Sequence, residues 1–413
     1  MSEVTRRDDD LRFGESARHA NGRRPGPWGS VMRVLGITVA VVLVSTLAVA
    51  GVVFNSLNSQ VQANVVQISE TEGPPPEIGA IEGGFNILIV GSDTRVGQDG
   101  IGGTEEDAGG ELNDVNILLH VSQDQTNATA VSFPRDLVVG IPECPDENGD
   151  TKYYSTEPLN TALYYGGLQC VVMAIEELTG LPIQFAGMID FLGVTNMADA
   201  IGGVDVCITS PVQDPNTGID LPVAGTYTLQ GGEALAFLRT RHGVGNGSDL
   251  TRISSQQVYL SSLVRKIKSD GTLTDAKKVF NLANAAVKNM RLSPGLADVY
   301  TLASIALAVR GIPLERITFV QYPGSTGGEG VYSGKVQPVQ WAADALFAQI
   351  ASDQPFVLES AGDGQGSTID PNASAQEQVD EASTAAPVSN EGLPVISGVS
   401  GQTAADFTCS IGY

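Results

Sequence analysis

Positive charge is scarce in this chain of 413 residues, which holds 23 Lys and Arg against 47 Asp and Glu, for a formal net charge of −24. Between Asn55 and Leu238 the basic residues are only Arg95, Arg135 and Lys152. Sequence-independent binding to nucleic acid requires clustered basic side chains, so we exclude nucleic acid as a partner. The same scarcity makes each arginine of this region informative about function.

Cysteine is also scarce, and several standard catalytic motifs are missing. Four cysteines are too few for a disulfide-built scaffold, and none lies in a C-x-x-C pair or near a histidine at zinc-ligand spacing. The sequence has no G-x-x-x-x-G-K-S/T, H-E-x-x-H, G-x-G-x-x-G or G-x-S-x-G motif. These absences argue against P-loop nucleotide hydrolysis, zinc proteolysis, dinucleotide redox chemistry and a serine nucleophile elbow.

One long uncharged segment covers residues 34–54, which is enough to cross about 30 Å of hydrocarbon as a helix. Three arginines precede it closely, and no basic residue follows until Arg95. The positive-inside rule therefore predicts a cytoplasmic segment over 1–33, a single-pass anchor in the cell membrane and an extracytoplasmic remainder. A cleaved signal peptide is the alternative, because residues 48–50 have an A-x-A pattern.

The rest of the chain divides by composition into a linker over 55–84, a globular region over 85–351 and a tail over 352–413. The tail has no basic residue and is rich in Ser, Ala, Gly and acids, so we expect it to be mostly disordered. Only Cys409, near its end, argues against a wholly free segment.

Apolar patterns in the globular region alternate between strands and helices. Runs typical of buried strands, and segments with helical periodicity, occur at Phe85–Val90, Val115–Val121, Ala128–Phe133, Leu168–Leu178, Phe191–Ile201, Ile253–Lys268, Arg316–Gln321 and Val339–Ile350. Interleaved strands and helices predict the α/β class.

Two aspartates lie at strand ends, where α/β sheets usually bind ligands. Asp93 follows the first predicted strand and Asp114 precedes the second. Two such carboxylates could share a hard cation such as Mg²⁺. The alternative is that each is an ordinary turn or capping aspartate.

The motif arginines are candidates for an anion site. Arg135 follows the third predicted strand, Arg239 and Arg241 alternate in one segment, and Arg252 begins a helix. A guanidinium can bind two phosphate oxygens at once and stays charged. Alternatively, these side chains are partners of the many acids. We interpret His242 as a structural histidine and Asp136 as a candidate for structural support.

The ordered motifs of residues 85–270 resemble the LytR-CpsA-Psr family, after an N-terminal membrane anchor. The matching segments are Ile87–Arg95, Asp114, Val131–Asp136, Leu159–Leu163 with Gly166-Gly167, Ala200–Val204, Ala234–Arg241 and Asp249–Gln257. The resemblance implies a three-layer α-β-α domain that binds a polyprenyl-pyrophosphate lipid. It also implies Mg²⁺-assisted transfer of a glycopolymer phosphate from this carrier to peptidoglycan.

The resemblance assigns roles by position. Asp93 and Asp114 would hold Mg²⁺ and act in catalysis with Arg135, Arg239 and Arg241. The residues expected to bind the pyrophosphate are Arg95, Arg135, Arg239, Arg241, Arg252 and Gln256. Two positions depart from the family: Leu112 and Ser255 stand where an arginine is usual. Two functional alternatives remain, a polyprenyl-pyrophosphate phosphatase and a non-catalytic lipid-binding protein of the cell envelope.

The four cysteines should be oxidised in an extracytoplasmic domain. Cys144 and Cys170 follow family-like segments near the expected mouth of the site, so we pair them with each other. This leaves Cys207 and Cys409 as the second pair, which would explain the apolar residues near the end of the tail. The alternative is a buried free thiol at Cys207, with Cys409 paired between molecules or not at all.

Overall fold

The structure is a computed structural model that describes residues 83–95, 98, 111–145, 149, 151–269, 286, 289–297, 299–371, 373 and 389–413. The predicted cytoplasmic segment, the predicted anchor and the linker up to residue 82 lie outside the described residues. Within the described part, no helix has both the length and the apolar character that a membrane span needs.

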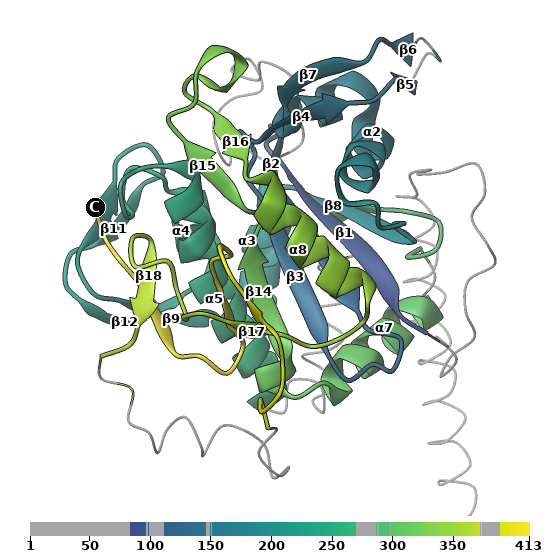
Figure 1. The fold of residues 1–413 in the computed structure, drawn as a ribbon. Coiled ribbons are helices and arrows are strands. Elements are labelled where there is room, and N and C mark those ends of the chain that lie inside the picture. The colour runs from purple at the N-terminus through teal and green to yellow at the C-terminus, as the bar shows by residue number, and fades with distance from the viewer. Residues whose placement is uncertain are drawn as a thin grey trace, which may run out of the picture. The chain divides into compact units, whose positions relative to one another are not determined.

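A seven-stranded mixed sheet organises the domain (Figure 1). Its strands are β1 (Phe85–Ser92), β2 (Asn113–Val121), β3 (Ala128–Phe133), β8 (Phe185–Ile189), β13 (Met290–Leu292), β14 (Ile317–Gln321) and β20 (Gly401–Thr403), in the order β13-β8-β1-β2-β3-β14-β20. β2 runs antiparallel to β1 and β3, whereas β8 is parallel to β1. The carboxyl ends of β1, β3 and β8 and the start of β2 therefore lie on the same side of the sheet, the side that faces the strand ends.

The central strands are apolar on both sides, as expected for a sheet covered on both faces. In β1, Leu88 and Val90 join one hydrophobic cluster, and Ile87 and Ile89 join the other. This alternation follows from the two-residue period of a strand. The two faces of β1 therefore contribute to two separate hydrophobic cores.

Helices cover both faces of the sheet (Figure 1). α2 (Ala162–Thr179) and α8 (Gln340–Ala351) contribute to the cluster that contains Leu88. α5 (Asp249–Ser269) and α7 (Val299–Gly311) contribute to the cluster that contains Ile87. The layers follow the order helix, sheet, helix that the family resemblance implies.

A third hydrophobic cluster lies beside the large sheet and positions one wall of the site. It joins helices and a second, four-stranded sheet in the order β12-β9-β21-β18. The elements of this region are α3 (Phe191–Ile201), β9 (Val204–Ile208), β10 (Val212–Asp214), β11 (Ile219–Leu221), β12 (Gly225–Leu229), α4 (Gly231–Arg239), β18 (Ser367–Ile369) and β21 (Thr408–Ser410). Helix α3 begins after Asp190, whose side chain accepts a hydrogen bond from the Gly193 amide at 2.8 Å, and ends at a left-handed Gly202.

Small strand pairs complete the described chain. They are β4 (Val138–Ile141) with β7 (Ser155–Pro158), β5 (Cys144–Pro145) with β6 (Thr151–Lys152), β15 (Gly324–Thr326) with β16 (Val336–Pro338), and β17 (Val357–Leu358) with β19 (Val395–Ile396). Disulfides join Cys144 to Cys170 and Cys207 to Cys409, the two pairings expected from the sequence.

The expectation of a mostly disordered tail over 352–413 is wrong for residues 352–371, which contain β17 and β18, and for residues 389–413. This segment adds β20 to the edge of the large sheet, where it pairs with β14. It also inserts β21 between β9 and β18. The composition of the tail concealed this order, because its strands are only two or three residues long and their partners lie far away in the sequence.

Candidate active site

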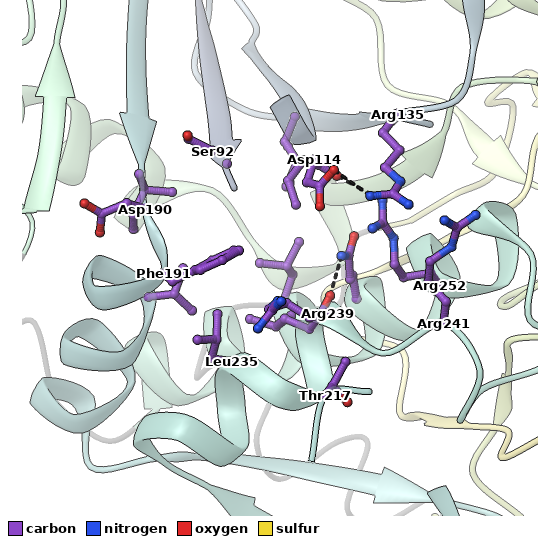
Figure 2. A pocket seen from close by; sticks show the side chains of 18 of the residues that line it. Ser92, Asp114, Arg135, Asp190, Phe191, Thr217, Leu235, Arg239, Arg241 and Arg252 are labelled. Carbon is purple, nitrogen blue, oxygen red and sulfur yellow. Dashed lines mark hydrogen bonds and ion pairs between the residues drawn. The ribbon is translucent and has the colours of Figure 1, made fainter. Parts of the chain in front are cut away.

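A pocket of about 410 Å³ opens where the strand ends of the large sheet face helices α3, α4 and α5. One part of its wall is apolar: Ile89, Val115, Ile117, Ile189, Phe191, Val194, Leu235, Leu238 and Leu260. The other part carries charged and polar groups, among them Asp114 and four arginines. Figure 2 shows this division, with Phe191 and Leu235 across the pocket from Arg135, Arg241 and Arg252.

The strand register explains why Asp114 and Arg135 meet. β2 begins beside the end of β1, and β3 ends beside the start of β2, so both side chains emerge at the same edge. Arg135 donates a hydrogen bond from Nη1 to Oδ1 of Asp114 at 2.6 Å. The two strand-end residues that the sequence predicted as functional are therefore joined directly.

Asp93 lies next to this edge, although Ser92 and not Asp93 lines the pocket. Its Oδ1 accepts a hydrogen bond from the Leu112 amide at 2.7 Å. Burial, followed by the negative charge of Asp114, raises the pKa of the Asp93 carboxyl despite that hydrogen bond. The charge of Asp114 thus acts in the same direction as burial on the Asp93 carboxyl.

This acidic pair fits a hard divalent cation. Each carboxylate uses Oδ1 for a protein partner, Leu112 or Arg135, and neither Oδ2 makes a hydrogen bond with a described residue. Carboxylate oxygens are the ligands that Mg²⁺ prefers, and a cation between them would remove the repulsion. The donor set is therefore compatible with the metal that the family resemblance implies.

Arg252 is the most deeply buried guanidinium of the site, with 4% of the residue exposed. Its Nη2 lies 2.8 Å from Oδ1 of Asp249 and donates to the backbone oxygen of Asp114 at 2.9 Å. Burial lowers its pKa, because water no longer solvates the charge. Asp249 also accepts from the backbone amide of Arg135 at 2.9 Å, so one buried carboxylate fixes two arginine-bearing segments.

Three guanidinium Nε–H groups are buried and have no hydrogen-bond partner among the described residues. They belong to Arg135, Arg241 and Arg252. The nearest acidic oxygens to the Arg135 Nε, on Asp136 and Asp249, both lie 3.9 Å away, beyond hydrogen-bond distance. Buried donors are nearly always satisfied in folded proteins, so this set indicates the place of an anionic ligand.

Arg239 is held in a different way. Its guanidinium carbon lies 4.3 Å from the centre of the Phe191 ring, a cation–π contact, and no hydrogen bond to another described residue is made. Burial lowers its pKa, while Asp114 favours the charged form. Its N–H groups thus remain available to a ligand. Gln256 ties α5 to the end of α4 by donating to the Leu238 oxygen at 2.7 Å.

Asp136 supports the arginines from behind. It accepts from Arg241 and from Lys335, at 3.2 Å in each case. Burial acts to raise the pKa of Asp136, but the charges of Arg135, Lys335 and Arg241 outweigh burial and lower it. The sequence analysis suggested structural support for Asp136, and the structure agrees.

Removing this carboxylate should change the pH dependence of stability. Because the pKa of Asp136 is lower in the folded state, its contribution is complete above the unfolded value and is lost as pH falls through the folded value. Asp136→Asn should therefore lower the free energy of unfolding at pH 7 by about 1.5–3 kcal/mol and flatten its decline in acid. Denaturant titrations between pH 3 and 7 measure both effects.

Glu177→Gln is the matched control, because Glu177 is exposed on α2 and has no partner among the described residues. It should leave the free energy of unfolding unchanged at every pH tested. An equal response in the two variants would contradict the supporting role of Asp136.

The remaining sequence-predicted residues divide into two groups. Gln256, with the four motif arginines, lines the pocket, whereas Arg95 is half-buried and does not line it, although its charge acts on Asp93 and Arg239. His242 lines the pocket with an exposed side chain, so its interpretation as a structural histidine is wrong.

The hydroxyl groups of Ser255 and Ser410 are joined by a hydrogen bond of 2.8 Å. Strand β21, which contains Ser410, therefore packs against the position at which the family usually has an arginine.

Several supporting residues were missed by the sequence analysis. Phe191, Asp249 and Lys335 hold arginines or their partners, and the β10–β11 hairpin contributes Asp214, Asn216 and Thr217 to the pocket. Asp249 had a usable signal, because it lies three residues before Arg252 at a helix start. No local sequence pattern indicated that the other residues belong to the site.

Comparison with known proteins relates this pocket to a family. The model of the LytR_cpsA_psr family matches residues 48–348. The chain belongs to that family. The family match covers all strands and helices that line the pocket, so the arginine cluster lies in the family domain.

Two relatives illustrate the functions found among similar proteins. The cell wall biosynthesis protein LcpA of Corynebacterium glutamicum is 30% identical over 328 residues, which cover 72% of this chain and 61% of the relative. The polyisoprenyl-teichoic acid–peptidoglycan teichoic acid transferase TagT of Bacillus subtilis is 24% identical over 329 residues, covering 78% and 93%. The chain spans slightly less than two thirds of LcpA and of the related LcpB of the same organism.

The solved structure of Bacillus subtilis TagV has the same fold. It is 21% identical, has a TM-score of 0.51, and the match covers 66% of this chain and 97% of TagV. At this identity the likeness concerns the fold alone. The LytR_cpsA_psr domain of this chain is therefore of the mixed α/β type found in its relatives.

Proposed function

We propose that the protein transfers a glycopolymer phosphate from a polyprenyl-pyrophosphate carrier to a hydroxyl group of peptidoglycan. The observation that carries the proposal is the amphipathic pocket, which joins an apolar wall to buried arginine donors without a protein partner. A lipid pyrophosphate has the same division into an apolar chain and a charged head. The transferase named TagT supports the substrate class, since its name gives a polyisoprenyl-linked donor and a peptidoglycan acceptor.

The arginines would bind the pyrophosphate and orient it. Arg239 lies against the Phe191 ring and has its N–H groups available. Arg135, Arg241 and Arg252 have Nε–H groups without a hydrogen-bond partner among the described residues. Phosphoryl transfer needs mainly positioning of the reactants and neutralisation of spread negative charge. Donors fixed in advance by Asp136 and Asp249 supply both, because they need not reorganise during the reaction.

The apolar wall would receive the first isoprene units of the carrier. Each buried CH₂ group contributes about 0.8 kcal/mol, so even a short part of the chain adds substantial affinity. Asp93 and Asp114 would hold Mg²⁺, which when bound neutralises pyrophosphate charge. In the proposed setting, residues 34–54 anchor the protein in the membrane, next to its lipid substrate.

Two alternatives differ from this reaction in one step each. In a pyrophosphate phosphatase, water replaces the glycan hydroxyl as acceptor. In a non-catalytic lipid-binding protein, the pocket binds but no bond breaks. The close pair Asp93 and Asp114 favours catalysis, because a lipid binder needs the apolar wall and the arginines but not a repelling carboxylate pair.

A reconstituted reaction tests the proposal. The full-length protein in detergent would be mixed with a synthetic polyprenyl-pyrophosphate oligosaccharide, peptidoglycan fragments and Mg²⁺, and the products analysed by mass spectrometry. We expect a glycan joined to peptidoglycan through a phosphodiester, together with free polyprenyl phosphate. Release of glycan phosphate to water alone would support the phosphatase. Binding of the lipid without any product would support the lipid-binding protein.

A further inference from the structure

His242 lies on the loop between α4 and α5 and is exposed at the pocket. Its ring makes no hydrogen bond or ion pair with any described residue, whereas the backbone around it is fixed. The Gly243 amide donates to Oγ1 of Thr240 at 3.1 Å, and the Tyr413 amide donates to the Gly243 oxygen at 3.1 Å. The imidazole is thus a free side chain on a held loop.

Each carboxylate that lines the pocket accepts at least one hydrogen bond from the protein. Asp114 accepts from Arg135 at 2.6 Å, and Asp190 accepts from the Gly193 amide at 2.8 Å and, on its other oxygen, from Gln98 at 2.8 Å. Asp214 accepts from Thr240 at 2.7 Å and from Asn216 at 3.0 Å. Burial acts to raise the pKa of Asp214, but these hydrogen bonds outweigh it and lower the pKa, which makes this carboxylate a weak base.

We propose that His242 is the general base that removes the proton from the acceptor hydroxyl. The inference rests on the proposed function and adds the residue that activates the acceptor. Among the described side chains that line the pocket, His242 is the one candidate base that makes no hydrogen bond or ion pair with a described residue. Its exposure also suits contact with a large acceptor that must approach from solvent.

The step balances as an ordinary phosphoryl transfer. A ring nitrogen of neutral His242 takes the hydroxyl proton while the acceptor oxygen forms a bond to the glycan-bearing phosphorus. The bond from this phosphorus to the bridging oxygen breaks, and that oxygen leaves as part of polyprenyl phosphate. The imidazolium then returns its proton to the departing phosphate or to solvent, and no oxidant or reductant is needed.

The surroundings of His242 determine how the pH dependence can be read. The charged groups that face the pocket from neighbouring elements are Asp114, Asp190, Asp214, Arg135, Arg239, Arg241 and Arg252, and Tyr413 packs beside the loop. Arginine keeps its proton in proteins, and imidazole groups change charge between about pH 5 and 8. Burial raises the pKa of the Asp93 carboxyl, so Asp93 can also respond to acid, and a pH effect is assigned to the imidazole only where the His242→Gln variant lacks it.

The test compares His242→Gln with the wild-type protein in the reconstituted transfer reaction. General-base catalysis contributes about 10²–10⁴-fold, so we expect at least a hundredfold loss of the maximal transfer rate. Affinity for the pyrophosphate lipid, measured separately by titration, should change less than twofold. The wild-type rate should rise from pH 5 to 8, and the variant should lose this rise. Added imidazole should partly restore His242→Ala.

Controls separate this inference from the proposed function. His120→Gln makes the same substitution on β2 away from the pocket and should retain transfer after correction for the folded fraction. A His242→Gln rate within threefold of wild type, or an unchanged pH profile, would overturn the assignment while wild-type transfer still supports the function. Absence of transfer by the wild-type protein would overturn the proposed function, and the role of His242 with it.

Discussion

Asp114→Ala should reduce transfer at least a thousandfold while the protein remains folded. Three interactions meet at this residue: its carboxylate pairs with Arg135, its backbone oxygen holds Arg252, and its remaining oxygen is a candidate Mg²⁺ ligand. Removal of the carboxylate frees Arg135 and eliminates half of the proposed metal site. Transfer rates at saturating lipid, with thermal melting to confirm folding, measure the effect.

Two further variants sharpen this test. Asp93→Ala should cause a loss of similar size if both carboxylates hold the cation, and Asp114→Asn should lose Mg²⁺ dependence while conserving the size of the side chain. Glu177→Gln again serves as the exposed acidic control. Unchanged activity in both alanine variants would refute the shared metal site.

Arg239→Ala should weaken binding of the pyrophosphate lipid by about ten- to a hundredfold. A charge-assisted contact to phosphate is worth about 1.5–3 kcal/mol, and Arg239 has its hydrogen-bond donors available. Arg239→Lys should recover little of the affinity, because lysine keeps the charge but lacks the planar group that lies on Phe191. Fluorescence titration of a short-chain polyprenyl pyrophosphate measures the dissociation constants.

Arg310→Ala is the matched control for this experiment, since Arg310 is exposed in the last turn of α7 and does not line the pocket. It should bind the lipid as the wild type does. Losses of equal size in Arg239→Ala and Arg310→Ala would mean that affinity follows total charge and not a dedicated clamp.

The sequence predicted those parts of the fold and site that depend on short-range patterns. Apolar runs gave the strands that begin at Phe85 and Ala128, and helical periodicity gave Phe191–Ile201 with its observed limits. Asp93, Asp114 and Arg135 could each be placed at a strand end, but the direct contact between Asp114 and Arg135 was not predicted. The family motifs then supplied Arg239, Arg241 and Arg252.

Features that depend on contacts between distant segments were not accessible in the same way. Phe191 looked like one apolar residue of a helix, and only the approach of α4 turns its ring toward Arg239. Exposure of His242 follows from the course of a loop, which has no periodic signature. Residues 389–413 are ordered because they pair with β14 and β9, which lie far away in the sequence. No local sequence pattern predicts such a pairing.

The pairing of residues 389–413 has a consequence for how the domain folds. The Gly245 amide donates to the Ile411 oxygen at 2.9 Å, and Val244 bridges Gly412, so the loop bearing Arg241 and His242 is held by the last part of the chain. The adjacent disulfide spans 202 positions. Contacts between such distant segments form late, and a chain delivered N-terminus first presents its early strands before this segment arrives. The binding loop would therefore become rigid only after β21 has docked, so we expect the proposed lipid binding to wait for a segment that is synthesised long after the motif arginines.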